Sequence, residues 1–179
     1  MRDERTREGL LLVSELLGYP GEDMPSRLPA YADQVSGLPT PVRRPLEEFL
    51  REAAGLDGFA LAEAYVTAFD LKGGVCLDLT YARYGDDRKR GAALADLKRR
   101  YQEAGFVPRD GELPDHLPLL LEFLGSAPEW AVRALAGEFL PEIRDLVERL
   151  RPSASPYRHV LEAGVEAVSA LPRAGRKGR

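Results

Sequence analysis

The stretch ELPDHLPLLLEFLG, residues 112–125, shows how this chain builds its secondary structure. Asp115 precedes the apolar run and is a typical N-cap, and Pro118 suits a first helical turn, where its missing N–H would have no helical partner. Leucines recur at helical spacing on one stripe, namely Leu117, Leu120, Leu121 and Leu124. We therefore expect a helix that Asp115 caps, with Leu120 and Leu124 buried in a core.

The same helical periodicity recurs on both sides of this stretch. Apolar faces at helical spacing occur near residues 10–17, 25–35, 41–55, 59–69, 86–105, 128–140, 141–150 and 156–171. Most of them end at a glycine or proline, as in GYPG at 18–21, and Asp86 is expected to cap the helix that Gly105 ends. These patterns predict a series of helices with short connections.

Residues 71–85 break the pattern, because Val75, Leu77, Leu79 and Tyr81 alternate as they would in a strand. The chain offers no second strand to satisfy the backbone of the first, so we expect helix or irregular chain here. The sequence thus predicts an all-α fold, a single irregular bundle of about seven to nine helices over residues 1–172. Residues 173–179 are predicted to form a disordered basic tail.

Composition limits the classes of protein. A length of 179 residues with 44% hydrophobic residues suits one domain with a substantial core. The single cysteine, Cys76, excludes an internal disulfide and cysteine-rich zinc or iron–sulfur sites. The apolar run at Leu10–Val13 is too short for a signal sequence or a membrane span. We expect a cytoplasmic protein without stable membrane insertion.

The charge is negative overall but unevenly distributed. The formal net charge is -4 although the C-terminal tail is basic, and an acidic excess lies within residues 108–150. Nucleic-acid binding requires the opposite sign, so we expect no nucleic-acid partner. The acidic excess would suit a cationic partner, although it would also be typical of a solvated surface.

Residues that could carry chemistry are few. The two histidines, His116 and His159, lie far apart and in no metal-ligand spacing. A Cys76–His116 pair has no local support, and a buried, inert Cys76 is the expectation. Glu112, Asp115 and Glu122 are explained as caps and helix-surface charges. We therefore expect no catalytic residue, no metal and no cofactor.

His116 itself has two interpretations that the residues alone leave open. It could simply hydrogen-bond Asp115 or a backbone carbonyl in the first turn of the helix. Alternatively, a histidine and carboxylates beside an apolar helix could hold a basic amphipathic peptide, with Asp115 and His116 both accessible from a groove.

Three stretches together resemble a known family. They are LLGYPGE at 16–22, AYVTAFDLKGGVCLDLTYARYGDDRKRGAALADLKRRYQEAG at 64–105 and ELPDHLPLLLEFL at 112–124. In combination they are similar to the NarJ-type chaperones that assemble respiratory nitrate reductase, within the TorD/DmsD superfamily. The resemblance covers roughly residues 10–150.

The resemblance implies an all-α protein without enzymatic activity. Such chaperones bind the catalytic, molybdenum-binding subunit in the cytoplasm, partly through its N-terminal peptide, support insertion of the molybdenum cofactor, and leave the finished enzyme. The superfamily residues that match Tyr65, Phe69, Asp115 and His116 lie at the peptide-binding cleft. The expected peptide-binding set is therefore apolar at Tyr65, Phe69, Leu117 and Leu121, and polar or charged at Asp70, Asp115, His116 and Glu122.

The sequence differs from the family pattern at two places, and two alternative functions are considered. Asp78 stands where relatives tend to carry an aromatic residue and could face solvent, and Gly73-Gly74 replaces a stretch that is often basic. One rival function is maturation of a different molybdoenzyme, against which LLGYPGE and GDDRKRG argue. The other is a small hydrolase that uses Cys76 or His116.

Overall fold

The computed structural model describes residues 2–69, 75–109 and 111–172. These residues form ten α-helices and no strand, which confirms the predicted all-α bundle. The helices are α1 (Arg2–Leu16), α2 (Met24–Ser36), α3 (Thr40–Ala53), α4 (Gly58–Phe69), α5 (Leu79–Tyr84), α6 (Arg88–Glu103), α7 (Leu117–Ser126), α8 (Glu129–Leu135), α9 (Leu140–Leu150) and α10 (Tyr157–Ala170). The described residues thus form one helix more than the predicted seven to nine, and the additional one is the short α5, in the stretch where helix or irregular chain was expected. The predicted tail, 173–179, lies outside the described residues.

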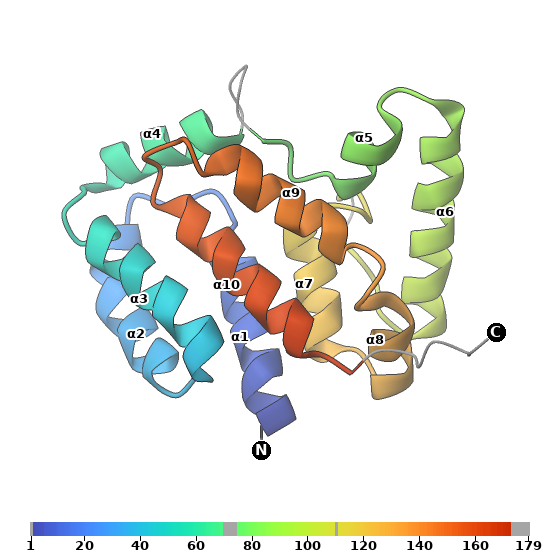
Figure 1. The fold of residues 1–179 in the computed structure, drawn as a ribbon, viewed down its shortest axis with the longest axis horizontal. Coiled ribbons are helices and arrows are strands. Elements are labelled where there is room, and N and C mark those ends of the chain that lie inside the picture. Colours follow the sequence, from blue (N-terminus) through green and yellow to red (C-terminus); the bar gives the residue numbers. More distant parts are fainter. Residues whose placement is uncertain (1, 70–74, 110, 173–179) are drawn as a thin grey trace.

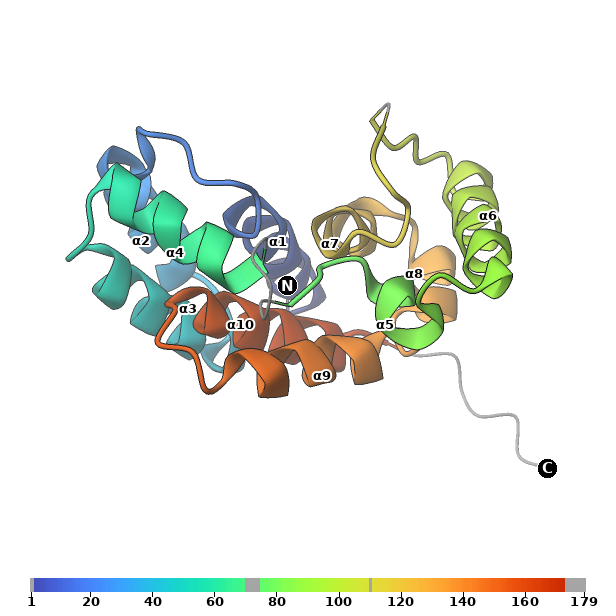
Figure 2. The ribbon, with the colours of Figure 1, turned by 90° about the horizontal axis from the view of Figure 1, so that it is seen from above.

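Helices α1 and α10 lie in the middle of the bundle (Figure 1). Helix α10 packs against α1, α3 and α9, and α1 also packs along α7. Seen from above, α2, α3 and α4 lie on one side of this centre, and α5, α6 and α8 lie on the other (Figure 2). The bundle is therefore built around helices from the two ends of the described chain.

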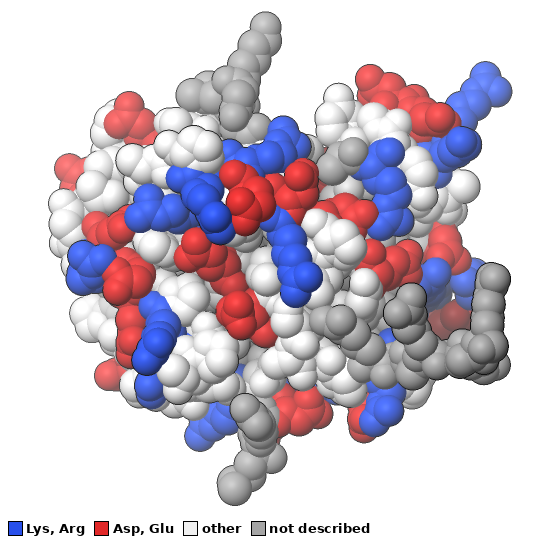
Figure 3. All heavy atoms as spheres, in the orientation of Figure 1, with Lys and Arg blue, Asp and Glu red and all other residues white. Residues whose placement is uncertain are grey.

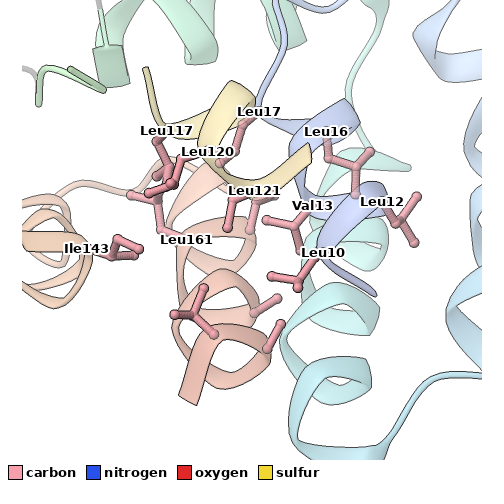
Figure 4. Packing of buried hydrophobic residues seen from close by; sticks show 14 of the residues in the cluster. Leu10, Leu12, Val13, Leu16, Leu17, Leu117, Leu120, Leu121, Ile143 and Leu161 are labelled. Atoms are coloured by element: carbon pink, nitrogen blue, oxygen red, sulfur yellow. The ribbon is translucent and has the colours of Figure 1, made fainter. Parts of the chain in front are cut away.

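The core is continuous between α1, α7 and α10. Leu10, Val13 and Leu17 extend toward Leu121 and Leu161 (Figure 4). Leu120 and Leu124 of α7 are almost completely buried, which confirms their predicted structural role. Leu119 and Phe123 are buried as well, so α7 is covered on more than the one stripe that the sequence indicated.

Close approach of α1 and α7 depends on a glycine and on two polar contacts. A Cβ atom on Gly125 would lie 2.8 Å from the Leu11 side chain and 3.2 Å from the carbonyl oxygen of Arg7. Near the same end of α7, Arg7 Nη1 donates to the carbonyl of Ala127 at 2.7 Å. At the other end, Ser14 Oγ donates to the carbonyl of Pro118 at 2.6 Å. The two helices are thus held together at both ends of α7.

The ambiguous stretch contains no regular strand in its described part, residues 75–85. Leu117 N donates to Leu77 O at 2.9 Å, and Leu79 N donates to Asp115 O at 3.1 Å. These two bonds make a single antiparallel bridge between Asp78 and His116, after which the chain enters α5. The prediction of helix or irregular chain is confirmed for these residues, while Gly73 and Gly74 lie outside the described part of the chain.

Two predicted caps are wrong. Helix α7 begins at Leu117 with His116 as its N-cap residue, so Asp115 does not cap it. Helix α6 is capped by Asp87, whose side chain accepts from Lys89 N at 2.8 Å, rather than by Asp86. The chain leaves α6 through Gly105, which has a positive φ of 73°, as expected for a helix-ending glycine.

The surface and the helix lengths add two observations. On the face seen in Figure 3, Lys and Arg lie among Asp and Glu, and neither sign forms a broad patch. None of the described helices combines the length and hydropathy that a bilayer span requires.

Candidate functional site

Asp115 is completely buried and holds the start of α5. Its Oδ2 accepts from the backbone N–H of Thr80 at 2.9 Å and from the Thr80 hydroxyl at 2.5 Å. Thr80 is the second residue of α5, so Asp115 satisfies an N-terminal amide of a helix 35 residues earlier in the chain. The expectation that Asp115 is accessible from a groove is therefore wrong, and its role in the described structure is to join α5 to the start of α7.

His116 is partly exposed, with 38% of its side chain accessible. Its Nδ1 lies 2.9 Å from Asp78 Oδ1, so its partner is Asp78 and not Asp115 or a backbone carbonyl, the partners that one of the two interpretations named. The bond to His116, together with the charges of His116 and Arg90, holds the pKa of Asp78 below its usual value against the opposing effect of burial. Asp78 is therefore not a free solvent-facing carboxylate.

Arg90 of α6 completes this arrangement. Its Nε donates to Thr80 Oγ1 at 3.2 Å, and its Nη2 lies 3.5 Å from Asp78 Oδ2 and 3.7 Å from Asp115 Oδ2. One guanidinium thus lies close to two carboxylates. We call Asp78, Thr80, Arg90, Asp115 and His116 the carboxylate–histidine cluster. No pattern in the sequence indicated a role for Thr80 or Arg90, although Arg90 belongs to the GDDRKRG stretch that carries part of the family resemblance.

A groove of about 410 Å³ lies between α1 and α7, next to the cluster. We call it the α1–α7 groove, and its lining residues are Leu11, Ser14, Glu15, Gly18, Arg109, Glu112, His116, Pro118, Leu119 and Glu122. His116 is the member of the cluster that lines it. The side chains of Glu112 and Glu122 have no ion-pair partner among the described residues. The groove therefore combines apolar surface with two carboxylates and one guanidinium, Arg109, none of which forms an ion pair among the described residues.

The other predicted site residues lie elsewhere. Leu117 and Leu121 are fully buried in the core and do not line the groove. Tyr65 and Phe69 are almost buried, with ring centroids 4.9 Å apart, and each ring also packs against Tyr157. Asp70 lies outside the described residues. Of the predicted set that the structure describes, His116 and Glu122 are thus the two residues that lie together at an accessible surface.

Tyr65 nevertheless connects its aromatic cluster to the groove. Its hydroxyl donates to the carbonyl of Leu17 at 3.0 Å, and Leu17 is followed by Gly18, which lines the groove. The ring also packs edge-on against Tyr19, with centroids 5.5 Å apart. Tyr65 therefore holds the chain at the point where α1 ends. Peptide contacts by Tyr65, Phe69, Leu117 and Leu121 remain predictions.

Cys76 does not form a nucleophilic pair. The residue is exposed, so the expectation of a buried thiol is wrong. Partial desolvation of the sulfur still raises the pKa of the thiol, which disfavours the reactive thiolate. His116 is bonded to Asp78 instead, and the described residues contain no group of three or more potential ligands that could hold a metal ion.

The chain is similar to known proteins over most of its length. The nitrate reductase delta subunit family matches residues 36–161. The probable nitrate reductase molybdenum cofactor assembly chaperone NarJ of Bacillus subtilis strain 168 is 36% identical over 160 residues, which cover 87% of each chain. The nitrate reductase molybdenum cofactor assembly chaperone NarJ of Escherichia coli K12 is 30% identical over 151 residues, covering 83% of this chain and 64% of that protein.

A third relative is much longer. The nitrate reductase-like protein NarX of Mycobacterium tuberculosis H37Rv is 34% identical over 152 residues, which cover 84% of this chain but only 23% of that protein. Similarity to all three relatives extends over more than four fifths of the chain.

Proposed function

The chain belongs to the nitrate reductase delta subunit family, and on this basis we propose that it is an assembly chaperone and not an enzyme. In this proposal it binds the catalytic subunit of a respiratory nitrate reductase in the cytoplasm before the molybdenum cofactor is inserted. It then separates from the finished enzyme. The relatives named as assembly chaperones for this cofactor support the proposal most strongly.

The α1–α7 groove is the proposed contact for the N-terminal peptide of the catalytic subunit. Leu11, which is 42% exposed, offers apolar surface beside the almost buried Leu119, and Glu112 and Glu122 offer negative charge without an ion-pair partner among the described residues. A peptide with apolar anchors and neighbouring Lys or Arg residues matches both properties. Apolar burial would supply most of the affinity, and the carboxylates would select the sign of the charge.

His116 is the proposed polar contact at the end of the groove. Its ring is oriented by the Nδ1 bond to Asp78, which leaves Nε2 available for a partner group. Asp115 acts indirectly, because it is buried and fixes the chain from which His116 projects. Leu117 and Leu121 would contact a partner only if α1 and α7 moved apart, since both are now covered by the core.

Complementation tests this function directly. A strain that lacks the chaperone would be supplied with the wild-type chain, with a Glu112→Gln/Glu122→Gln variant or with Glu166→Gln. Glu166 is exposed on α10 outside the groove and serves as a control for the loss of a single surface charge. We expect the wild type and the control to restore molybdenum content and nitrate reductase activity, and the groove variant to restore less.

Two results would overturn parts of the proposal. If the wild-type chain restored no molybdenum to the catalytic subunit, the chaperone function would be wrong. If it bound the N-terminal peptide of another molybdoenzyme as tightly as that of nitrate reductase, the assignment to nitrate reductase would be wrong.

A further inference from the structure

A second hollow lies beside the α1–α2 connection, residues 17–23. It has a volume of about 590 Å³, and we call it the Tyr19–Phe59 pocket. The connection contributes Tyr19, Pro20, Gly21 and Glu22, and the start of α4 contributes Asp57, Gly58, Phe59 and Ala62. Figure 2 shows the connection and α4 on the same side of the bundle. None of these residues belongs to the predicted peptide-binding set.

The walls of the pocket are held by close packing. A Cβ atom on Gly58 would lie 2.9 Å from the carbonyl oxygen of Glu22, so only glycine allows the connection to approach α4 this closely. Asp57 Oδ1 accepts from Ala60 N at 2.8 Å and caps α4. Tyr19 is braced by its edge-on contact with Tyr65. The pocket is therefore defined by the fold and does not need a ligand to form.

Two aromatic rings at this pocket are open to solvent. Phe59 is 79% exposed and Tyr19 is 65% exposed. Single exposed aromatic residues are common, but here two of them line one hollow. The electron-rich faces of such rings attract cations.

The charge around the rings is negative. Residues 17–23 and 57–63 contain Glu22, Asp23, Asp57 and Glu63 but no Lys or Arg, and none of these carboxylates has an ion-pair partner among the described residues. The nearest bases along the chain are already paired, Arg27 with Glu15 and Arg51 with Glu48. The partial positive charge at the start of α4, roughly half a unit, is smaller than that of the carboxylates.

We propose that the Tyr19–Phe59 pocket binds an arginine or lysine side chain of a partner polypeptide. The cation would lie against the rings of Phe59 and Tyr19, and Glu22 and Asp57 would balance its charge. The pocket adjoins the α1–α7 groove, because Gly18 lines the groove and the next residue, Tyr19, lines the pocket. One extended partner segment can thus fill both the groove and the pocket. This link between the two sites rests on the proposed function.

A small probe tests the pocket without any assumption about the partner. Nα-acetyl-arginine amide would be titrated into the protein, with the uncharged citrulline analogue as the comparison, while the ring signals of Tyr19 and Phe59 are followed by NMR. We expect the arginine probe to shift these signals at millimolar concentration and the citrulline analogue not to. Asp57→Asn, which retains the cap, should weaken the response. Equal responses to the two probes, or no response to either, would overturn the proposal.

A peptide titration tests whether the pocket serves the partner. The probe is a synthetic peptide of the N-terminal segment of the nitrate reductase catalytic subunit from the same organism. Phe59→Ala should reduce its affinity about two- to fivefold, as expected for one exposed cation–aromatic contact. The reduction should disappear when the basic residues of the peptide are replaced by glutamine.

The control is Trp130→Ala. Trp130 is also an exposed aromatic residue, at 57%. Its hollow is lined by Arg99 and Arg100, which are paired with acids, so it differs in charge from the Tyr19–Phe59 pocket. This variant should bind as the wild type does.

If His116→Ala weakened binding while Phe59→Ala and Asp57→Asn did not, the shared segment would be excluded and the proposed function would stand. If the peptide did not bind the wild type, peptide recognition would fail, and the arginine probe would still decide on the pocket.

Discussion

At the scale of single residues, Asp115 and His116 are neighbours with opposite roles. The antiparallel bridge to Asp78 holds this segment extended, and successive side chains of an extended chain point to opposite sides. Asp115 therefore points inward to Thr80, while His116 points outward and meets Asp78, its opposite residue in the bridge. The sequence indicated that both residues matter. It did not reveal the pairing, because the bridge joins positions 38 residues apart.

Removal of the Asp115 carboxylate should destabilise the fold. Asp115→Ala leaves the amide and hydroxyl of Thr80 without their buried acceptor and leaves Arg90 with one carboxylate fewer. We expect the free energy of unfolding to fall by about 2–4 kcal/mol in urea unfolding experiments. Glu112→Ala, an exposed acid three positions away, is the control and should change it by less than about 0.5 kcal/mol. Equal effects of the two substitutions would contradict the structural role of Asp115.

Asp78 should make stability depend on acid pH. Its pKa is lower in the folded protein than the value of about 3.9 expected for an unfolded chain. The unfolded state therefore binds the proton more readily, so the contribution of Asp78 is fully present above about pH 4 and is lost as the pH falls through the lower folded pKa. In urea unfolding experiments between neutral pH and about pH 2, the free energy of unfolding should fall less steeply with decreasing pH for Asp78→Asn than for the wild type. The same slope in both proteins would show that the contact with His116 has no energetic effect.

At the scale of helices, the structure explains why α7 is more deeply buried than its main stripe indicates. Phe123 lies outside that stripe, yet its ring packs against Tyr101 of α6 at 4.5 Å between centroids, and Tyr101 donates to the carbonyl of Pro114 at 2.8 Å. Periodicity identifies the face that a helix buries against its main neighbour. It does not identify a second neighbour, which depends on where α6 returns in space.

The crossing of α1 and α7 can be tested with a pair of glycines. Gly125→Ala adds a methyl group that would clash with Leu11 and with the backbone of Arg7, so we expect a loss of about 1–3 kcal/mol in the free energy of unfolding. Gly91→Ala is the control, since a Cβ atom at this α6 position meets nothing within 4 Å. That substitution should stabilise the protein by about 0.5–1 kcal/mol through helix propensity. A stabilising effect at both positions in thermal and urea unfolding would show that the crossing tolerates a side chain.

At the scale of the whole molecule, the helical fold was predictable and the groove was not. Residue spacing and turn signals were sufficient to predict the class of fold, but α5 is a single short helix whose N-terminal amide is satisfied by Asp115 from outside its own segment. The α1–α7 groove joins residues near 11–18 to residues near 109–122, and no local pattern relates them. The same holds for the Tyr19–Phe59 pocket, which depends on the approach of Glu22 to Gly58. Long-range packing decides which charged residues share one surface.

The most direct test of the account is a calorimetric titration with the N-terminal peptide of the nitrate reductase catalytic subunit. The wild type, Glu112→Gln/Glu122→Gln and Glu166→Gln would be compared at low salt. We predict binding by the wild type and the Glu166 variant with equal affinity, and binding about 2- to 30-fold weaker by the double variant, since each exposed charge contact contributes about 0.2–1 kcal/mol. Unchanged affinity of the double variant would show that the peptide binds outside the α1–α7 groove, and absence of binding by the wild type would contradict peptide recognition itself.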